Sequence, residues 1–399
     1  QQLYTKNIQS FQSKANFFYN TFYTMTFSCS VIRGTDAIVQ DEKCYLKFPN
    51  TAPLDHATTP YSLYKPILFN GIPLVDFQDF LHGSKEQKFE VAAKMGHACR
   101  EVGFFYLVNH GIPQALVDGT FAAAKEFFSL PLEAKEKTSY VDGGVRGYFG
   151  MRSEDLNQFD KTKKSRGDMK EGFDVGLEAS TLKSSNDYVG NKLSPTFHSR
   201  NQWPTELPRL KIIMEKYIDS LRALSELLVE AFAISLGVKK ATFPINTPCI
   251  NLRMNHYPAR TTGQNGLNEK RTDEMGCGAH TDYGLFTILS QDSVGGLQVL
   301  NSSGDWVNAT PIENSFVINI GDMMHRWTNG RYASTLHRVV DLRKGKKDRI
   351  SIPFFFNPNC DALVECITNK EEDALFEAET AENILTERYE MAFKKKEKS

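Results

Sequence analysis

Two histidines and one aspartate suggest the chemistry that this chain could perform. One residue separates His280 from Asp282, and His337 follows later in the chain. Two imidazoles and one carboxylate hold non-haem Fe(II) on one face of an octahedron, which leaves the opposite face open for oxygen and an organic co-substrate. Side chains alternate along a strand, so positions 280 and 282 would point the same way and His337 would come from a second strand. The spacing therefore predicts an iron site.

Arg349 and Ser351 form a second group with the same spacing. On a strand these two side chains share a face. A guanidinium fork matches the geometry of a carboxylate, such as one on an organic co-substrate of the iron. We therefore expect Arg349 to bind that carboxylate with the Ser351 hydroxyl beside it. Taken without the histidines and Asp282, Arg349 would be expected in a surface salt bridge.

Composition and charge are those of an ordinary globular protein. Of 399 residues, 41% are hydrophobic and 24% are charged, and the formal net charge is −1. Such a balance gives no reason to expect nucleic acid or an anionic membrane as a partner. No apolar run approaches the roughly 20 residues of a membrane helix. We expect a monomer that acts on a small-molecule substrate.

The cysteines predict reduced thiols. The chain has seven, an odd number, without any CxxC spacing. Neither a disulfide framework nor a thiolate zinc site is indicated, and a cytoplasmic location follows as an expectation. Cys277 lies three residues before His280, but a thiolate ligand would favour other metals, so we do not expect it to bind the iron.

The pattern of apolar residues predicts five parts. Residues 1–69 show no clean period and form an N-terminal extension. Residues 70–205 contain a strand at 72–77, a helix at 85–101, a strand at 103–108, a helix at 114–128 and an irregular segment at 140–204. Residues 140–200 are expected to be mobile without substrate and to become ordered when it binds. A long helix at 207–236 fills the third part, 206–249, and ends at Gly237. The last two parts are a barrel at 250–367 and a C-terminal part at 368–399, which contains a charged helix at 371–394 and a tail.

The barrel is predicted from short strands between turns. They are expected at 251–257, 285–290, 297–300, 306–309, 316–320, 335–340 and 350–356. Many short strands at regular spacing indicate an antiparallel barrel or a double-sheet jelly roll. The expected fold class is α+β, mostly β, with a double-stranded β-helix core and flanking helices.

Over roughly residues 70–360 the chain resembles the iron(II)- and 2-oxoglutarate-dependent dioxygenases, in the branch of isopenicillin N synthase and the plant flavonoid and gibberellin oxidases. The segments that carry the resemblance are 104–111, 280–284, 295–299, 319–322, 327–330 and 334–339, in the family's order. The resemblance implies that iron is bound by His280, Asp282 and His337. It implies that 2-oxoglutarate is bound by Arg349, Ser351, Tyr257 and Asn255.

The cofactors implied by the resemblance are Fe(2+), 2-oxoglutarate and O2, with ascorbate as an optional reductant. The implied reaction decarboxylates 2-oxoglutarate to succinate and carbon dioxide and hydroxylates or desaturates a small organic molecule. Segment 170–174 resembles the part of the family near the substrate, with a charged loop as its alternative. A core role is expected for Phe286, Phe354 and Phe356, with lining of the pocket as their alternative.

Two other functions stay open from the sequence. One is an oxidase of the same fold that uses iron and oxygen without 2-oxoglutarate, as isopenicillin N synthase does; such relatives keep the Arg-x-Ser pair. The other is a catalytically silent binding protein on the same scaffold, against which the complete His-Asp-His set argues. The substrate's identity is not encoded in any spacing, because loops and pocket shape set selectivity.

Overall fold

The structure is a computed structural model that describes residues 69–141, 143–156, 167–184, 190, 192–259, 275–340, 347–368 and 372–393. These residues all belong to one compact unit, Phe48–Ser399. Apart from Phe69, the predicted N-terminal extension lies outside the described residues. Within the described part of the chain, no helix is both long and apolar enough to cross a membrane.

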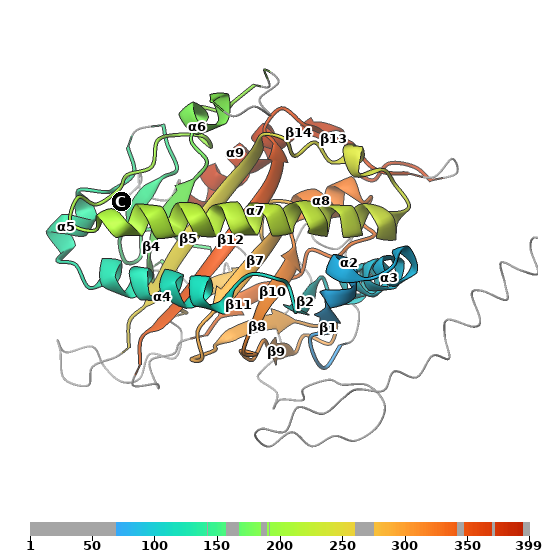
Figure 1. Ribbon diagram of the computed structural model, residues 1–399, viewed down its shortest axis with the longest axis horizontal. Coiled ribbons are helices and arrows are strands. Elements are labelled where there is room, and N and C mark those ends of the chain that lie inside the picture. Colours follow the sequence, from blue (N-terminus) through green and yellow to red (C-terminus); the bar gives the residue numbers. More distant parts are fainter. Residues whose placement is uncertain are drawn as a thin grey trace, which may run out of the picture. The chain divides into compact units, whose positions relative to one another are not determined.

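A large mixed sheet forms the centre of this unit (Figure 1). Its eight strands lie in the order β1-β2-β10-β7-β12-β5-β4-β3, and every neighbouring pair is antiparallel except β1 with β2. The bounds are β1 (Leu74–Asp76), β2 (Phe104–Val108), β3 (Gly147–Phe149), β4 (Glu171–Gly176), β5 (Pro248–Tyr257), β7 (Phe286–Gln291), β10 (Ser315–Ile320) and β12 (Arg349–Asn359).

A smaller antiparallel sheet completes the β structure. Its order is β6-β11-β8-β9, with β6 (Cys277–His280), β8 (Leu297–Leu300), β9 (Trp306–Asn308) and β11 (His337–Val339). β13 (Leu363–Val364) and β14 (Glu379–Thr380) form a separate pair. The architecture is therefore mixed α and β with extensive antiparallel pairing.

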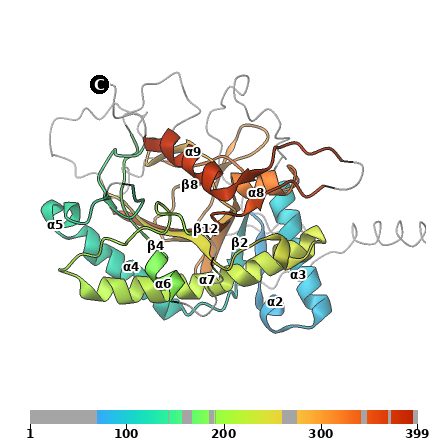
Figure 2. The same cartoon turned by 90° about the horizontal axis from the view of Figure 1, so that it is seen from above.

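Helices cover both faces of the large sheet. α7 (Pro208–Leu236) crosses one face beside α4 (Gln114–Phe128), whereas α9 (Ala381–Phe393) lies on the opposite side (Figures 1 and 2). The remaining helices are α2 (Gln78–His82), α3 (Lys85–Glu101), α5 (Leu132–Glu136), α6 (Ala179–Lys183), α8 (Asp322–Trp327) and the 3-10 turn Lys240–Thr242.

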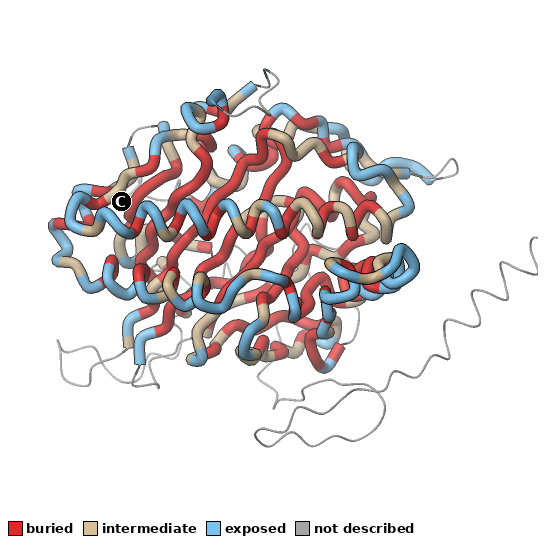
Figure 3. Tube along the Cα trace, in the orientation of Figure 1, coloured by how far each residue is buried: buried red, intermediate tan, exposed pale blue. Residues whose placement is uncertain are grey.

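The main core lies between α7 and the sheet. Along α7, buried residues recur every three or four positions, so one stripe of the helix packs inward while the rest faces solvent (Figure 3). Phe232 of α7 meets Phe286 of β7 with ring centroids 5.4 Å apart. The helix ends at Gly237, whose φ of 70° is left-handed and favours glycine.

The strongest periodic patterns gave correct predictions. Helices at 85–101 and 114–128 have the predicted bounds, and the long helix begins one residue later than expected, at Pro208. Segment 140–204 is not irregular throughout, because it contains β3, β4 and α6. β4 is buried along its whole length and pairs on both sides, so this part is a sheet strand rather than a mobile loop. The last helix begins at Ala381 rather than at 371.

The expectation that all thiols are reduced is wrong for one pair. Cys249 and Cys360 form a disulfide with their Cα atoms 6.1 Å apart, although 111 positions separate them in sequence. The antiparallel register of β5 and β12 sets Pro248 opposite Asn359, which brings the two cysteines together. Spacing along the chain carries no signal of such a pairing. Free cysteines in the described residues are Cys99, Cys277 and Cys366.

Candidate metal centre and co-substrate pocket

The pairing of β6 with β11 brings the two histidines together. His280 and His337 are direct partners in the register, and their ring centroids are 4.3 Å apart. Asp282 lies two residues beyond the end of β6, so it does not share a strand with His280 as the spacing predicted. The Oδ1 atom of Asp282 is nevertheless 3.6 Å from Nε2 of each histidine. One potential ligand atom from each residue lies within 4.8 Å of the others.

Hydrogen bonds hold both imidazoles so that their Nε2 atoms face Oδ1 of Asp282. Nδ1 of His280 is 2.8 Å from the carbonyl of Gly278, and Nδ1 of His337 is 3.1 Å from the carbonyl of Thr335. A carbonyl can only accept, so each Nδ1 carries the proton and each Nε2 keeps a lone pair. Such outer contacts orient metal-binding histidines.

The aspartate is held in the same way. Its Oδ2 accepts hydrogen bonds from the Thr287 hydroxyl at 2.5 Å and from the Asn319 amide at 2.7 Å, which leaves Oδ1 facing the imidazoles. Although burial opposes ionisation, the neighbouring His337 and His280 lower the pKa of Asp282. Two aimed Nε2 atoms and one carboxylate oxygen fit the donor set of a divalent iron site.

The histidines have opposite pKa shifts. Burial, and then the charge of His337, lower the pKa of His280 to about 3. Burial lowers the pKa of His337, but the facing Asp282 carboxylate raises it by more, so the pKa is raised overall.

A buried arginine occupies the second predicted site. Arg349 begins β12 opposite Tyr257 of β5, and Ser351 lies opposite Asn255. The Arg349 side chain is only 1% exposed, donates to the Ser351 hydroxyl over 2.8 Å and lies 4.8 Å from the centre of the Tyr257 ring. The four residues predicted to bind 2-oxoglutarate therefore lie together.

Among the described residues, this group has no negative partner. No carboxylate among the described residues is within ion-pair distance of Arg349, and Nε of Arg349 and Oδ1 of Asn255 have no hydrogen-bond partner there. A buried cation without an anion is costly. The group is thus suited to an anionic ligand, and the surface salt bridge that Arg349 alone would suggest is not what the structure contains.

The arginine group adjoins the strands that carry the histidines. A Cβ on Gly276, next to β6, would lie 3.1 Å from Cδ1 of Tyr257 and 3.1 Å from Cγ1 of Val339 on β11. Tyr257, Cys277 and Val339 also share one apolar cluster. The arginine group therefore lies beside the two strands, β6 and β11, on which His280 and His337 lie.

A buried lysine near His280 contacts two carboxylates and a thiol. Nζ of Lys170 contacts Glu154 at 2.8 Å, Asp168 at 3.1 Å and Sγ of Cys277 at 3.2 Å. Asp168 accepts from the Gly278 amide at 2.9 Å. Cys277 lies outside the His-Asp-His group, and burial raises the pKa of its thiol. Sequence reasoning missed Glu154 and Asp168, which carry no spacing signal.

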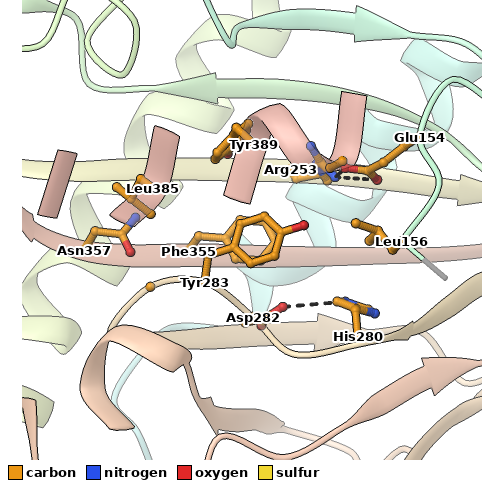
Figure 4. Close-up of a pocket in the computed structure, with 12 residues that line it drawn as sticks. Glu154, Leu156, Arg253, His280, Asp282, Tyr283, Phe355, Asn357, Leu385 and Tyr389 are labelled. Atoms are coloured by element: carbon orange, nitrogen blue, oxygen red, sulfur yellow. Dashed lines mark hydrogen bonds and ion pairs between the residues drawn. The ribbon is translucent and has the colours of Figure 1, made fainter. Parts of the chain in front are cut away.

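A pocket opens beside the potential metal ligands (Figure 4). It has an empty volume of about 520 Å³, part of it open to solvent. The lining residues are Glu154, Leu156, Arg253, His280, Asp282, Tyr283, Gly284, Phe355, Asn357, Leu385, Tyr389 and Ala392.

The core role expected for the three phenylalanines is confirmed, and a neighbouring phenylalanine lines the pocket instead. Phe286, Phe354 and Phe356 belong to the main core, and Phe355 lines the pocket. Side chains alternate along β12, so Phe355 shares its face with Arg349.

Three other histidines have partners away from the His-Asp-His group. His110 accepts from the amide of Ile112 at 3.2 Å, as expected for a turn. His256 lies between Glu171 and Asp348, at 2.8 and 3.0 Å, and Nδ1 of His325 bonds to the carbonyl of Tyr332 at 2.6 Å.

Two family models match most of the described chain. Residues 72–206 match the N-terminal region of the non-haem dioxygenases in morphine synthesis. Residues 249–358 match the 2OG-Fe(II) oxygenase superfamily. The second match contains all seven residues of the two predicted sites.

Individual relatives agree with these models. A homoarginine 6-hydroxylase of Glycine max is 35% identical over 74% of this chain and 88% of its own length. A 2-oxoglutarate-Fe(II) type oxidoreductase of Emericella nidulans is 34% identical over 74% and 82%. The crystal structure of a full-length Neurospora crassa protein in complex with alpha-KG and thymine has 33% identity and a TM-score of 0.66, covering 79% of this chain and 96% of that one. The chain belongs to the 2-oxoglutarate-Fe(II) oxygenase superfamily.

Proposed function

We propose that His280, Asp282 and His337 are the only protein ligands of the catalytic iron. The observation that carries this proposal is the convergence of their three ligand atoms within 4.8 Å. Both imidazoles keep an Nε2 lone pair for the metal, because their Nδ1 protons are donated to backbone carbonyls. Three protein ligands on one side leave room for a chelating co-substrate.

Arg349, Ser351, Tyr257 and Asn255 are proposed to hold 2-oxoglutarate. The guanidinium would take the distal carboxylate, with the Ser351 hydroxyl as a second donor. The unpartnered Nε of Arg349 and the absence of an anionic partner in the described residues support this assignment. The Tyr257 ring beneath the guanidinium fixes its plane and excludes water.

The enzyme uses Fe(II), 2-oxoglutarate and O2 to hydroxylate or desaturate a small organic molecule, as its family and relatives do. When bound, the iron and the keto acid supply the oxidising chemistry, with succinate and carbon dioxide as products. The chain's own part is to orient these groups and to keep water away. Leu156, Leu385 and Ala392 provide the apolar side of the pocket, next to His280 and Asp282.

The finer architecture and setting are also proposals. The antiparallel strands of the two sheets correspond to the double-stranded β-helix of the fold class. The chain is divided into the five parts 1–69, 70–205, 206–249, 250–367 and 368–399, of which 250–367 is the barrel. Solved relatives with TM-scores up to 0.67 support this arrangement. We propose a monomer without a nucleic-acid or membrane partner. The cytoplasmic location stays a prediction, because the Cys249–Cys360 disulfide removes part of its basis.

Two measurements test the proposed function. Anaerobic titration of the metal-free protein with Co(II) should show one site, lost in His280→Ala and in Asp282→Ala. Succinate release from 2-oxoglutarate in the presence of Fe(II) and O2 separates the oxygenase from an oxidase that uses no keto acid. Metal binding without any turnover over a broad metabolite panel would favour the silent binding protein.

A further inference from the structure

The charged groups around the substrate pocket are already paired with one another. Arg253 donates to both oxygens of Glu154 at 3.0 Å and to both oxygens of Asp174, at 2.8 and 2.9 Å. Lys170 adds a second cation to Glu154 and is itself bonded to Asp168. All these side chains are buried, so their charges are compensated inside the protein rather than by solvent.

The helix that closes the other side of the pocket carries a compensated charge as well. Nη2 of Arg388 on α9 lies 3.1 Å from Oδ2 of Asp322 and 3.1 Å from the Thr281 hydroxyl. The same guanidinium lies 4.6 Å from the centre of the Tyr283 ring, which forms part of the lining. Apart from the iron ligands, the described lining therefore offers no unmatched charge to a substrate.

Two polar atoms of the lining do lack partners. The Tyr283 hydroxyl and Oδ1 of Asn357 are buried and make no hydrogen bond to any described residue. The Asn357 amide nitrogen donates to the carbonyl of Cys249 at 2.9 Å, which fixes the side chain so that Oδ1 is the acceptor left over. A buried acceptor without a donor costs free energy, which a ligand N–H group would recover.

Aromatic side chains supply much of the remaining lining. Tyr283, Phe355 and Tyr389 come from three different elements, and Tyr283 and Tyr389 meet edge to face with centroids 6.0 Å apart (Figure 4). Aromatic faces favour flat ligands with polar edges. Leu156, Leu385 and Ala392 complete the lining without adding polar groups.

We infer that the substrate is an uncharged, flat ring compound whose edge carries an N–H group for Asn357 and a hydrogen-bonding group for Tyr283. This inference rests on the proposed function and narrows it, because the relatives include both a homoarginine hydroxylase and a protein crystallised with thymine. A zwitterionic amino acid could find its own partners only by separating Arg253 from Glu154, which would leave buried charges uncompensated.

The inference is tested by binding to the Co(II)- and 2-oxoglutarate-loaded full-length protein without oxygen, measured by calorimetry. The probes are two uncharged rings, thymine and 5-methyl-2-pyridone, and two charged relatives of thymine, orotate and 5-(aminomethyl)uracil, with homoarginine as the zwitterion. At least one uncharged ring should bind, and each charged compound should bind at least about tenfold more weakly, since ionic groups resist transfer into a charge-balanced pocket. Equal or tighter binding of any charged compound, or binding of neither uncharged ring, overturns the inference.

Two variants test the contacts themselves. Tyr283→Phe and Asn357→Leu should each weaken binding of the uncharged ring roughly tenfold, as expected for one lost hydrogen bond in a buried site. Tyr217→Phe is the matched control, because it removes a buried hydroxyl that bonds to Ser290 outside the pocket, and it should not weaken ring binding. Unchanged ring affinity in both pocket variants contradicts the inference. Failure of the unmodified protein to bind 2-oxoglutarate at all is a different result, which contradicts the proposed function instead.

Discussion

Replacement of Arg349 by glutamine isolates the electrostatic role of the co-substrate pocket. The guanidinium is 1% exposed, touches the Tyr257 ring and donates to Ser351, and it has no carboxylate partner among the described residues. Arg349→Gln would leave the distal carboxylate of 2-oxoglutarate in a dry pocket without its counter-charge. Losing one partner of a buried charged contact costs about 2–5 kcal/mol, which is roughly a 30-fold to several-thousandfold increase in the Kd of 2-oxoglutarate.

The assay is calorimetric titration of 2-oxoglutarate into the Co(II)-loaded protein under anaerobic conditions. Co(II) affinity, measured first, should barely change because the arginine is not a metal ligand. Arg349→Lys should recover only part of the loss, since a point charge cannot reproduce the two-pronged contact.

Arg338→Gln is the control for this experiment. Arg338 also belongs to the barrel, but its guanidinium lies 3.9 Å from the centre of the Trp306 ring and bonds to Gln298 rather than to the proposed pocket. An unaltered Kd for 2-oxoglutarate in Arg349→Gln would refute the assignment. The oxidase without a keto acid would then become the better interpretation.

Three further predictions concern the metal, acid stability and the disulfide. His280→Ala should abolish Co(II) binding and turnover while the far-ultraviolet circular dichroism stays native; retained activity would exclude His280 as a ligand. Burial opposes ionisation of Glu154, but Arg253 and Lys170 lower its pKa to about 2 from an ordinary 4.5. This shift adds on the order of 3 kcal/mol to the free energy of unfolding above pH 4.5, and the contribution is lost as the pH falls toward 2. Urea unfolding at a series of pH values should show this loss in the native protein but not in Glu154→Gln. Exchanging Cys249 and Cys360 for serine should lower the free energy of unfolding by about 2–4 kcal/mol, and an unchanged melting temperature would show that the pair is not bonded in solution.

The proposed site residues could be identified from the sequence because they occur at short, recognisable spacings. His-x-Asp and Arg-x-Ser are short spacings that appear in the sequence itself, and the family order of motifs links them. The helix at 114–128 could be predicted equally well, since its apolar residues repeat at a helical period. In each case the information lies within a few neighbouring residues.

The missed features depend on contacts between distant segments. β4 contains charged residues and two glycines, which suggest a loop, yet Asp174 is buried because Arg253 of β5 and Asn251 bond to it. The partner that compensates the charge lies on another strand, so composition alone misjudges the segment. The Cys249–Cys360 disulfide has the same origin, because only the register of β5 with β12 brings the two sulfurs together.

The alternation along β12 explains how one strand serves both the core and the chemistry. Ile350, Ile352, Phe354 and Phe356 belong to the main apolar core. Of the odd-numbered residues, Phe355 and Asn357 line the pocket, whereas Arg349 and Ser351 belong to the proposed co-substrate group. Because successive side chains point to opposite faces, a shift of one residue in the register would bury the arginine among the apolar side chains of α7. The even-numbered phenylalanines therefore contribute without lining the pocket, because their packing fixes the register that places the neighbouring side chains in the pocket and in the proposed co-substrate group.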